Sequence, residues 1–340
     1  MKLVVGQESK ASNPGRALGP RGWDQILQVL PSRLRQVLAR LQPHQVRDLS
    51  EVRIRANRPL QIIVNGTCRF VGGSGELTTV DKALVPTGDE CVEALHQMAR
   101  WSIYALQQEM KNGYLTLPGG HRVGFTGEAV LEGEELKLIR HVTSLNIRLA
   151  REVLGKGLSV AEAMLADNGQ LLNTLIIGPP NSGKTTLLRD LARVLGTGCP
   201  SRGLPIFQVA IIDERSEIAA CHRGIPQFDV GVATDVLDRC PKAIGIQNIL
   251  RAMAPEVIIT DEIGRVEDVD AVYDAARSGV ALVSSAHASG LEQAYTRPIV
   301  AKLLAENLFD QVVVLSRRQG PGTIEAITSV KERRGCRCDG

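Results

Sequence analysis

One short stretch narrows the choice of folds for this chain more than any other: residues 176–188 read IIGPPNSGKTTLL. The eight residues from Gly178 to Thr185 match the pattern G-x-x-x-x-G-K-[ST], and they stand between an apolar run and a helix-like pattern. In this setting glycines let backbone N–H groups turn inward around phosphate groups, and the start of the helix adds its partial positive charge. The sequence therefore predicts a loop that holds a nucleoside triphosphate.

The residues of this loop have separate expected roles. We expect Lys184 to reach the β- and γ-phosphates of ATP, and the Thr185 hydroxyl to bind the Mg²⁺ that bridges them. The alternative is a purely structural glycine-rich turn, which the strand-to-helix setting disfavours. The residues expected to surround the nucleotide are Gly178, Pro179, Pro180, Asn181, Ser182, Gly183, Lys184, Thr185 and Thr186.

Three later apolar runs end in polar residues that complete the expected site. VIITDE ends in Asp261, expected to hold Mg²⁺ through water, and Glu262, expected to polarise the attacking water. VAIIDERSEI delivers Asp213 and Glu214, and ALVSSAHA delivers His287. A lone histidine is usually structural. Because three strands here bring polar ends to one crevice, we expect His287 to sense the γ-phosphate or to act as a switch.

The pattern of the apolar runs predicts an α/β fold. From about residue 160 onwards helix-like stretches alternate with short β-branched runs that lack polar alternation, which is typical of parallel strands covered on both faces. Ligands of such sheets bind beyond the carboxyl ends of the strands. In the front half, Val52 and Ile54 alternate with Arg53 and Arg55, and Asn65-Gly66 predicts a hairpin turn. This half is expected to be a smaller α+β domain.

We expect the chain to divide into four parts. Two domains suit a length of 340 residues. The expected parts are a loose leader at 1–22, an α+β N-terminal domain at 23–155, a P-loop ATPase domain at 160–330 and a basic tail at 331–340.

Charge and composition narrow the possible partners. Residues 1–160 hold 21 Lys and Arg against 15 Asp and Glu, whereas residues 161–340 hold 19 against 22. The basic front half is the support for a rival reading, a P-loop ATPase that acts on nucleic acid. Aromatic residues make up 3% of the chain, which leaves little material for stacking bases. The nucleic-acid signal is therefore weak.

The cysteines and the hydropathy predict the compartment. Seven cysteines without regular spacing argue against a disulfide framework and for a reducing environment. Cys336 and Cys338 form a C-x-C pair with no second ligand pair nearby, which makes a weak metal site. No stretch approaches the roughly 20 apolar residues that a membrane span needs. We expect a cytoplasmic protein that can sit against a membrane.

The order of these motifs resembles that of the secretion and pilus motor ATPases. Their ATPase domains carry a Walker A loop, an aspartate box, a Walker B strand and a histidine box in that order. Residues 178–185, 213–215, 261–262 and 285–288 fill these places. Within that superfamily, the blocks SEVRIRANRPL, GYLTLPGGHRVGFTGEAV, GPPNSGKTTLLRDLAR, DVGVATDVLDRCPKA and PEVIITDEIG are similar to the stage III sporulation protein AA family.

This resemblance implies a RecA-like ATPase core, homo-hexameric assembly and ATP with Mg²⁺ as ligands. It also implies docking on integral membrane proteins of a channel complex, at the inner face of a membrane in a sporulating bacterium. The sequence departs from the secretion motors at two points. The aspartate box reads Asp213-Glu214-Arg215-Ser216, which leaves the general base open, and Arg265 stands one position later than the usual arginine after Walker B.

The resemblance gives the basic front half a mechanical interpretation. Arginines of one N-terminal domain could complete the nucleotide site of the neighbouring subunit by stabilising phosphate charge in trans. Any single one of these arginines is more often a surface cation. A third reading, a slow nucleotide-switched regulatory scaffold, stays open beside the motor and the nucleic-acid ATPase. The pool of possible trans arginines is Arg53, Arg55, Arg122, Arg140 and Arg148.

Overall fold

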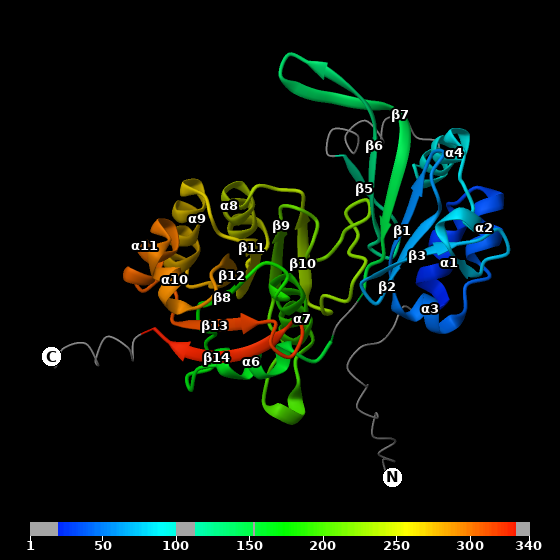
Figure 1. Ribbon diagram of the computed structural model, residues 1–340. Coiled ribbons are helices and arrows are strands. Elements are labelled where there is room, and N and C mark those ends of the chain that lie inside the picture. Colours follow the sequence, from blue (N-terminus) through cyan, green and yellow to red (C-terminus); the bar gives the residue numbers. More distant parts are fainter. Residues whose placement is uncertain (1–19, 100–112, 152–153, 331–340) are drawn as a thin grey trace, which may run out of the picture.

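The chain folds into two lobes, each built on its own seven-stranded sheet (Figure 1). The computed structural model describes residues 20–99, 113–151 and 154–330. Strands of the first lobe come from residues 49–148 and strands of the second from residues 174–329. The expected basic tail and all but the last three residues of the expected leader lie outside the described residues, and helix α1 begins at Pro20.

The N-terminal lobe contains an antiparallel sheet with the strand order β4-β3-β2-β1-β7-β6-β5. Asn65 and Gly66 join β2 to β3 with φ angles of 49° and 72°, the left-handed pair that a two-residue hairpin favours, so the predicted turn is confirmed. At the top of Figure 1, β6 and β7 continue beyond their neighbours as a long hairpin. The strands are β1 Leu49–Arg55, β2 Gln61–Val64, β3 Thr67–Val71, β4 Leu77–Thr78, β5 Tyr114–Thr116, β6 Arg122–Glu132 and β7 Glu135–Arg148.

Helices cover one face of this sheet and leave the other face to basic residues. The alternation in β1 is confirmed, because Val52 and Ile54 are fully buried whereas Arg53 and Arg55 are partly exposed. The helices lie on the side away from the second lobe (Figure 1), so the arginine face is turned towards it. The helices are α1 Pro20–Gln28, α2 Ser32–Leu38, α3 Pro43–Asp48, the 3₁₀ turn Val80–Lys82 and α4 Gly88–Met98.

The C-terminal lobe is the predicted α/β layer structure. Its sheet has the order β10-β9-β11-β12-β8-β13-β14, and its neighbouring strands are parallel except for the pair β13 and β14. The strands are β8 Thr174–Gly178, β9 Val209–Asp213, β10 Thr234–Asp238, β11 Val257–Glu262, β12 Ala281–His287, β13 Gln311–Ser316 and β14 Thr323–Ser329. The helices are α6 Gly157–Met164, α7 Lys184–Thr197, the 3₁₀ turn Pro200–Arg202, α8 Lys242–Ala252, α9 Val266–Arg277, α10 Leu291–Thr296 and α11 Pro298–Ala305.

Alternate strand residues in this lobe enter two separate cores. Ile176 and Ile211 pack with α6 and α7 on one face of the sheet. Ile177 and Ile212 pack with α8, α9 and α11 on the other face. Because both faces are buried, the strands need no polar alternation, which is why they appear in the sequence as continuous apolar runs. No helix within the described ranges is long and apolar enough to cross a membrane.

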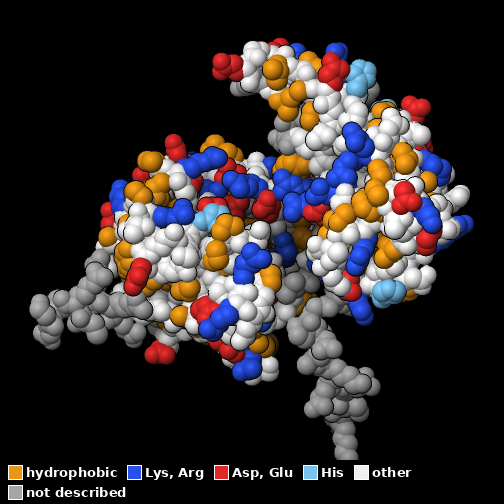
Figure 2. Space-filling view, in the orientation of Figure 1, with side chains coloured by type: hydrophobic (Ala, Val, Ile, Leu, Met, Phe, Trp, Pro, Cys, Tyr) orange, Lys and Arg blue, Asp and Glu red, His pale blue; other side chains and the backbone are white. Residues whose placement is uncertain are grey.

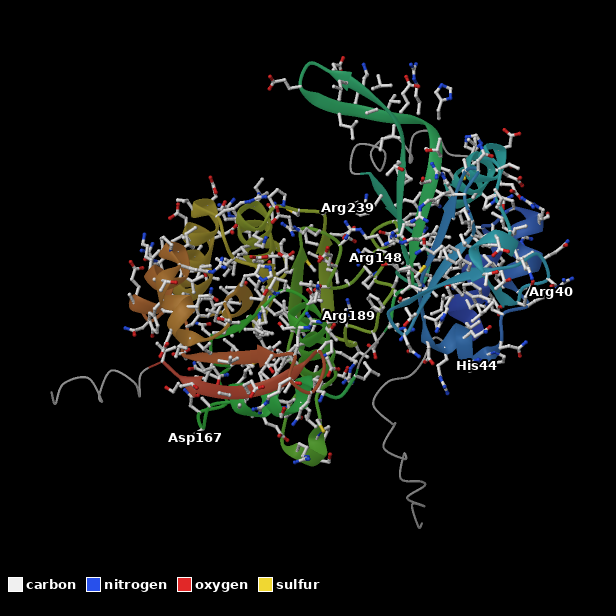
Figure 3. All side chains as sticks on the ribbon, viewed as in Figure 1. Arg40, His44, Arg148, Asp167, Arg189 and Arg239 are labelled. Carbon is white, nitrogen blue, oxygen red and sulfur yellow. The ribbon has the colours of Figure 1, made fainter. Side chains whose placement is uncertain are left out.

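Basic side chains gather where the two lobes meet (Figure 2). Arg148, Arg189 and Arg239 lie along this junction (Figure 3). Among the hydrogen bonds that cross it, the Gly119 N–H donates to Gln227 Oε1 at 2.8 Å, and His222 Nδ1 lies 2.9 Å from the Thr116 carbonyl oxygen. The lobes are therefore joined by specific contacts as well as by the connecting chain.

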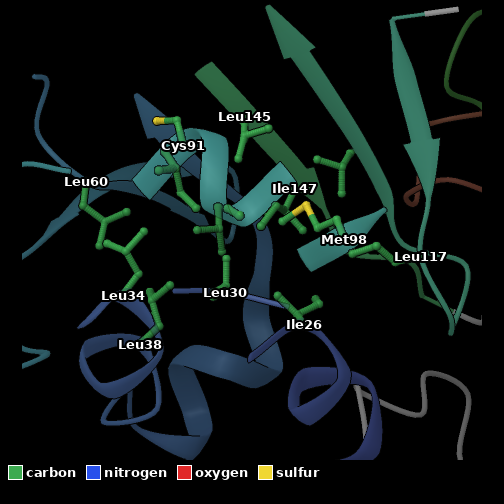
Figure 4. Close-up of a cluster of buried hydrophobic side chains, with 14 of the residues drawn as sticks. Ile26, Leu30, Leu34, Leu38, Leu60, Cys91, Met98, Leu117, Leu145 and Ile147 are labelled. Atoms are coloured by element: carbon green, nitrogen blue, oxygen red, sulfur yellow. The ribbon is translucent and has the colours of Figure 1, made fainter. Parts of the chain in front are cut away.

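The N-terminal core is a cluster of aliphatic side chains between the sheet and its helices (Figure 4). Ile26, Leu30, Leu34 and Leu38 of the helical layer are fully buried against Ile147 of β7. Burying a side chain of this size contributes about 1.5–3 kcal/mol relative to its exposed state. Cys91 is also in this core, and none of the five cysteines in the described ranges is disulfide-bonded.

We expect the buried His121 to make the stability of the N-terminal lobe dependent on pH. Its side chain is 1% exposed, Nδ1 accepts a hydrogen bond from the Ala150 N–H at 3.1 Å, and burial lowers its pKa to about 4. In the unfolded chain the histidine pKa is about 6.5, so the free energy of unfolding is highest above that pH. As the pH falls towards 4 the unfolded chain takes up the proton first, and the free energy of unfolding decreases by about 3 kcal/mol in total. Chemical denaturation should therefore show the advantage of wild type over His121→Gln shrinking from pH 7 to pH 4.5. An advantage that is independent of pH would contradict this assignment.

Candidate nucleotide-binding site

Strand order and register bring the predicted polar residues to one edge of the C-terminal sheet. β12 lies beside β8 with His287 opposite Gly178, where the phosphate-binding loop begins. β11 lies on the other side of β12 with Glu262 opposite Ser285. All three strands are parallel, so their carboxyl ends meet at the same edge.

The loop between β8 and α7 has the backbone shape that anion binding requires. Asn181 and Gly183 have left-handed φ angles of 58° and 94°. α7 begins at Lys184, and no side chain caps it. The first N–H groups of the helix therefore face the loop without a capping partner. A Cβ atom on Gly183 would stand 2.7 Å from the Gly322 nitrogen, which leaves glycine as the residue that fits.

A pocket of about 470 Å³ lies over this loop, and it contains most of the predicted site. Gly178 and Pro179 lie beneath it, where their carbonyl oxygens accept hydrogen bonds from Lys184 Nζ at 2.9 and 3.1 Å. The lining residues are Pro180, Asn181, Ser182, Gly183, Lys184, Thr185, Thr186, Arg215, Glu217, Asp261, Glu262, Ser285, His287 and Pro321.

His287 connects the lysine of the loop to the glutamate of β11. Lys184 Nζ lies 3.0 Å from His287 Nδ1, and His287 Nε2 lies 3.0 Å from Glu262 Oε2. Because an ammonium group can only donate, Nδ1 must accept, which places the ring proton on Nε2 and directs it at Glu262. Burial lowers the pKa of Lys184, and the charge of Glu262 opposes this shift. The three side chains form one polar chain across the pocket.

A second charge cluster lies beside the pocket and is centred on Lys242, the first residue of α8. Its ammonium group forms ion pairs with Glu214 and, at 2.9 Å, with Asp261, and Lys242 itself is 6% exposed. Burial raises the pKa of Asp261, an effect that Lys242 opposes. Arg265 lies 3.3 Å from Glu214 and is outside the pocket. The structure thus places Glu214 and Arg265 outside the pocket lining, and Glu214 shares the Lys242 ammonium group with Asp261.

Asp213 lies below the pocket and is fully buried. Its carboxylate accepts hydrogen bonds from the N–H groups of Glu217, Ile218 and Ala219 at 2.8–2.9 Å. Burial raises its pKa to about 6, although these N–H groups favour the charged form. Asp213 therefore holds the backbone of the loop after β9. Its side chain does not line the pocket.

The five pooled arginines lie on the N-terminal lobe and each has a partner within the chain. Arg53 and Arg148 contact Glu51 at 2.8 and 3.7 Å, and Arg55 donates to Gln61 at 2.7 Å. Arg140 pairs with Glu128 at 2.6 Å on the long hairpin. Arg122 pairs with Glu217 at 2.9 Å, so it reaches the nucleotide pocket of its own chain.

Sequence reasoning missed Lys242 and Pro321, and it gave no role to Arg215 and Glu217. Pro321 lies in the turn between β13 and β14, where the Gly322 N–H donates to the Ser182 carbonyl oxygen at 2.7 Å. Arg215 and Glu217 follow the acids of β9 directly, so their proximity in sequence was the available signal. Lys242 lies in the block DVGVATDVLDRCPKA, but no local pattern in that block gives the lysine a role.

The residues present fit a magnesium nucleoside triphosphate. The buried Ser182 hydroxyl has no hydrogen-bond partner among the described residues, and the uncapped helix start supplies further donors. Thr185 and Asp261 line the same pocket. Magnesium at nucleotide sites takes most of its ligands from phosphates and water, so one hydroxyl and one carboxylate are an ordinary protein contribution.

Comparison with known proteins identifies relatives in sequence and in fold. The family described as "Sporulation stage III, protein AA" matches residues 21–338. Stage III sporulation protein AA of Bacillus subtilis (strain 168) is 44% identical over 306 residues, which cover 89% of this chain and 94% of that protein. An uncharacterised protein, ycf45, of Cyanidium caldarium is 28% identical over 207 residues, 58% of this chain and 55% of that one.

Two solved structures show the fold. The ATPase DotB of Legionella pneumophila has a TM-score of 0.51 at 18% identity, covering 89% of this chain and 78% of DotB. The pilus retraction motor PilT with bound ADP has a TM-score of 0.52 at 15% identity, covering 78% of this chain and 74% of PilT. The fold is therefore that of the RecA-like secretion and pilus ATPases, as expected from the order of the motifs.

Proposed function

The chain belongs to the stage III sporulation protein AA family, and on this premise we propose that it is an oligomeric ATPase. It binds ATP with Mg²⁺ at residues 178–186 and hydrolyses it. The cycle powers or assembles a membrane-associated transport complex during sporulation, with the protein on the cytoplasmic side and bound to integral membrane proteins of that complex. The expected assembly is a homo-hexamer.

The observation that carries this proposal is the polar chain Lys184–His287–Glu262 across the pocket. A terminal phosphate of a bound nucleotide would attract the Lys184 ammonium, which would then release His287 Nδ1. His287 and Glu262 would be free to change position together, so the histidine can report the presence of that phosphate. When bound, Mg²⁺ supplies positive charge to the phosphate oxygens.

The surroundings of the acids favour Glu262 as the general base. Glu262 is partly exposed in the pocket lining, whereas Glu214 is held by Lys242 and Arg265 outside it. Asp213 is already bound by three backbone N–H groups. A base must reach the water that attacks, and of these three acids only Glu262 lines the pocket.

We further propose that the parts 23–155 and 160–330 move as two bodies around the nucleotide. PilT, whose fold this chain shares, is a pilus retraction motor that binds ADP, and a similar use of the nucleotide cycle suits the two lobes of this chain. Arg53, Arg55 and Arg148 are on the arginine face of the N-terminal sheet, and in a ring that face could approach the pocket of a neighbour. Nucleotide would then favour a closed arrangement by its higher affinity for it.

Replacing Glu262 by Gln tests this function. The variant should keep nucleotide affinity, because the phosphate-binding donors are intact, and should lose hydrolysis by roughly 10²–10⁴-fold, because the general base is gone. Light scattering should show the assembled form accumulating with ATP and Mg²⁺. Glu267→Gln, an exposed acid on α9, is the matched control and should behave as wild type. Hydrolysis by Glu262→Gln at the wild-type rate would remove Glu262 from the mechanism, and monomers alone with ATP would count against the ring.

A further inference from the structure

The segment after β9 connects the nucleotide pocket to the N-terminal lobe. We call residues 214–228 the bridging segment. Its Arg215 and Glu217 line the pocket. Its His222 and Gln227 make the two hydrogen bonds to the N-terminal lobe described above. One continuous stretch therefore touches both the expected phosphate position and the other lobe.

The start of the bridging segment is held rigidly from two sides. On the side of the sheet, Asp213 accepts the N–H groups of residues 217–219. On the side of α7, the guanidinium of Arg189 donates to the carbonyl oxygens of Glu217 and Ile218 and stacks on the Phe228 ring at 3.8 Å. Arg189 belongs to the helix that begins at the phosphate-binding loop, and it lies at the junction of the lobes (Figure 3). The backbone of residues 217–219 is therefore tied both to the end of β9 and to α7.

Glu217 is the point at which the segment contacts the N-terminal sheet. Its Oε1 accepts a hydrogen bond from Arg122 Nη1 at 2.9 Å. Arg122 is stacked over the Tyr114 ring at 3.6 Å, and the Tyr114 hydroxyl lies 3.5 Å from the Arg215 carbonyl oxygen. Arg122 and Tyr114 come from β6 and β5, so both contacts end on the edge of the N-terminal sheet.

We infer that Glu217 and Arg122 form a latch through which the nucleotide pocket sets the position of the N-terminal lobe. This inference rests on the proposed binding of ATP. A polyphosphate in the pocket repels the Glu217 carboxylate and attracts the Arg122 guanidinium, so it weakens their pairing. Because the backbone of residues 217–219 is clamped, the latch opens by displacement of Arg122 and the strand that carries it. Glu217 is thus a positioning residue, and Arg122 acts within its own chain.

Coupling of this kind is reciprocal, which gives the latch a measurable signature. If nucleotide binding opens the latch, removing the latch makes binding easier by the same factor. Glu217→Gln and Arg122→Gln should each abolish the response of the N-terminal lobe to nucleotide. Glu217→Gln should also bind nucleotide more tightly, by about fivefold or more, since both the latch and the repulsion are removed.

Hydrogen exchange read by mass spectrometry on the full chain tests the latch. A non-hydrolysable ATP analogue with Mg²⁺ should slow exchange in residues 178–190 and alter exchange in residues 113–125 of wild type. Both single variants should keep the first effect and lose the second, and the charge swap Arg122→Glu with Glu217→Arg should restore part of it. Glu128→Gln is the control: Glu128 is on β6, the strand of Arg122, and the change breaks its exposed pair with Arg140 of β7, so this variant should respond as wild type.

The two levels of the proposal fail separately. If the analogue leaves residues 178–190 of wild type unprotected, the proposed function fails and the latch with it. If it protects them but residues 113–125 do not respond in wild type, or respond equally in Glu217→Gln, the latch is wrong and the proposed function stands.

Discussion

Replacing Lys184 by alanine should abolish ATP hydrolysis and weaken nucleotide binding, with a loss of at least roughly 10²–10³-fold in turnover. Lys184 is 8% exposed at the start of α7, and within the described chain it is the lysine that lines the pocket. Without the ammonium group, only the backbone N–H groups of the loop remain to bind the phosphate charge. The change also leaves His287 Nδ1 without its present donor, so the link to Glu262 is lost. Steady-state phosphate release and titration with a fluorescent nucleotide measure both effects.

The fold should survive this change. Lys184 Nζ donates to the carbonyl oxygens of Gly178 and Pro179, and these oxygens can accept hydrogen bonds from water in its place. Circular dichroism should therefore match wild type. Lys302→Ala, an exposed lysine on α11, is the matched control and should keep full activity. Unchanged turnover in Lys184→Ala would falsify the assignment of residues 178–185 as a phosphate-binding loop.

The central part of the C-terminal lobe could be predicted because its strands are buried on both faces. β8, β9, β11, β12 and β13 appear in the sequence as short apolar runs, and once they are placed side by side their polar ends converge on one edge. This signal did not predict the two edge strands, β10 and β14. β10 has a burial pattern without a fully buried residue, and β14 is antiparallel and half exposed, so neither forms an apolar run.

Roles at the site were harder to predict than positions. The acids at the end of β9 looked equivalent in the sequence. The backbone of residues 217–219 folds over Asp213, whereas Glu214 turns to a lysine 28 residues away. Likewise the alternation of β1 predicts that Arg53 and Arg55 share a face, but nothing in it shows that Glu51 and Gln61 pair with them. Contacts between distant segments decide these roles, and a local pattern carries no information about them.

Replacing Lys242 by methionine should destabilise the C-terminal lobe by about 3–5 kcal/mol, the cost of removing one partner from a buried ion pair. Methionine has a similar length, so packing is largely kept and the loss is electrostatic. Without the ammonium group, Glu214 and Asp261 are left as neighbouring carboxylates at the ends of β9 and β11. Arg265 remains beside Glu214, and the charge of Arg215 still acts on both carboxylates. Burial already raises the pKa of Asp261, and a second uncompensated carboxylate raises it further.

A double variant distinguishes this electrostatic cause from a packing defect. Lys242→Met combined with Glu214→Gln removes one of the two neighbouring negative charges. Chemical denaturation should therefore show that part of the lost stability returns. Lys137→Met, which breaks the exposed pair with Glu132 on the long hairpin, should cost less than about 1 kcal/mol. If the single variant is as stable as wild type, Lys242 is not the counter-ion of Asp261. If the second substitution instead adds to the loss, the role of Lys242 is in packing.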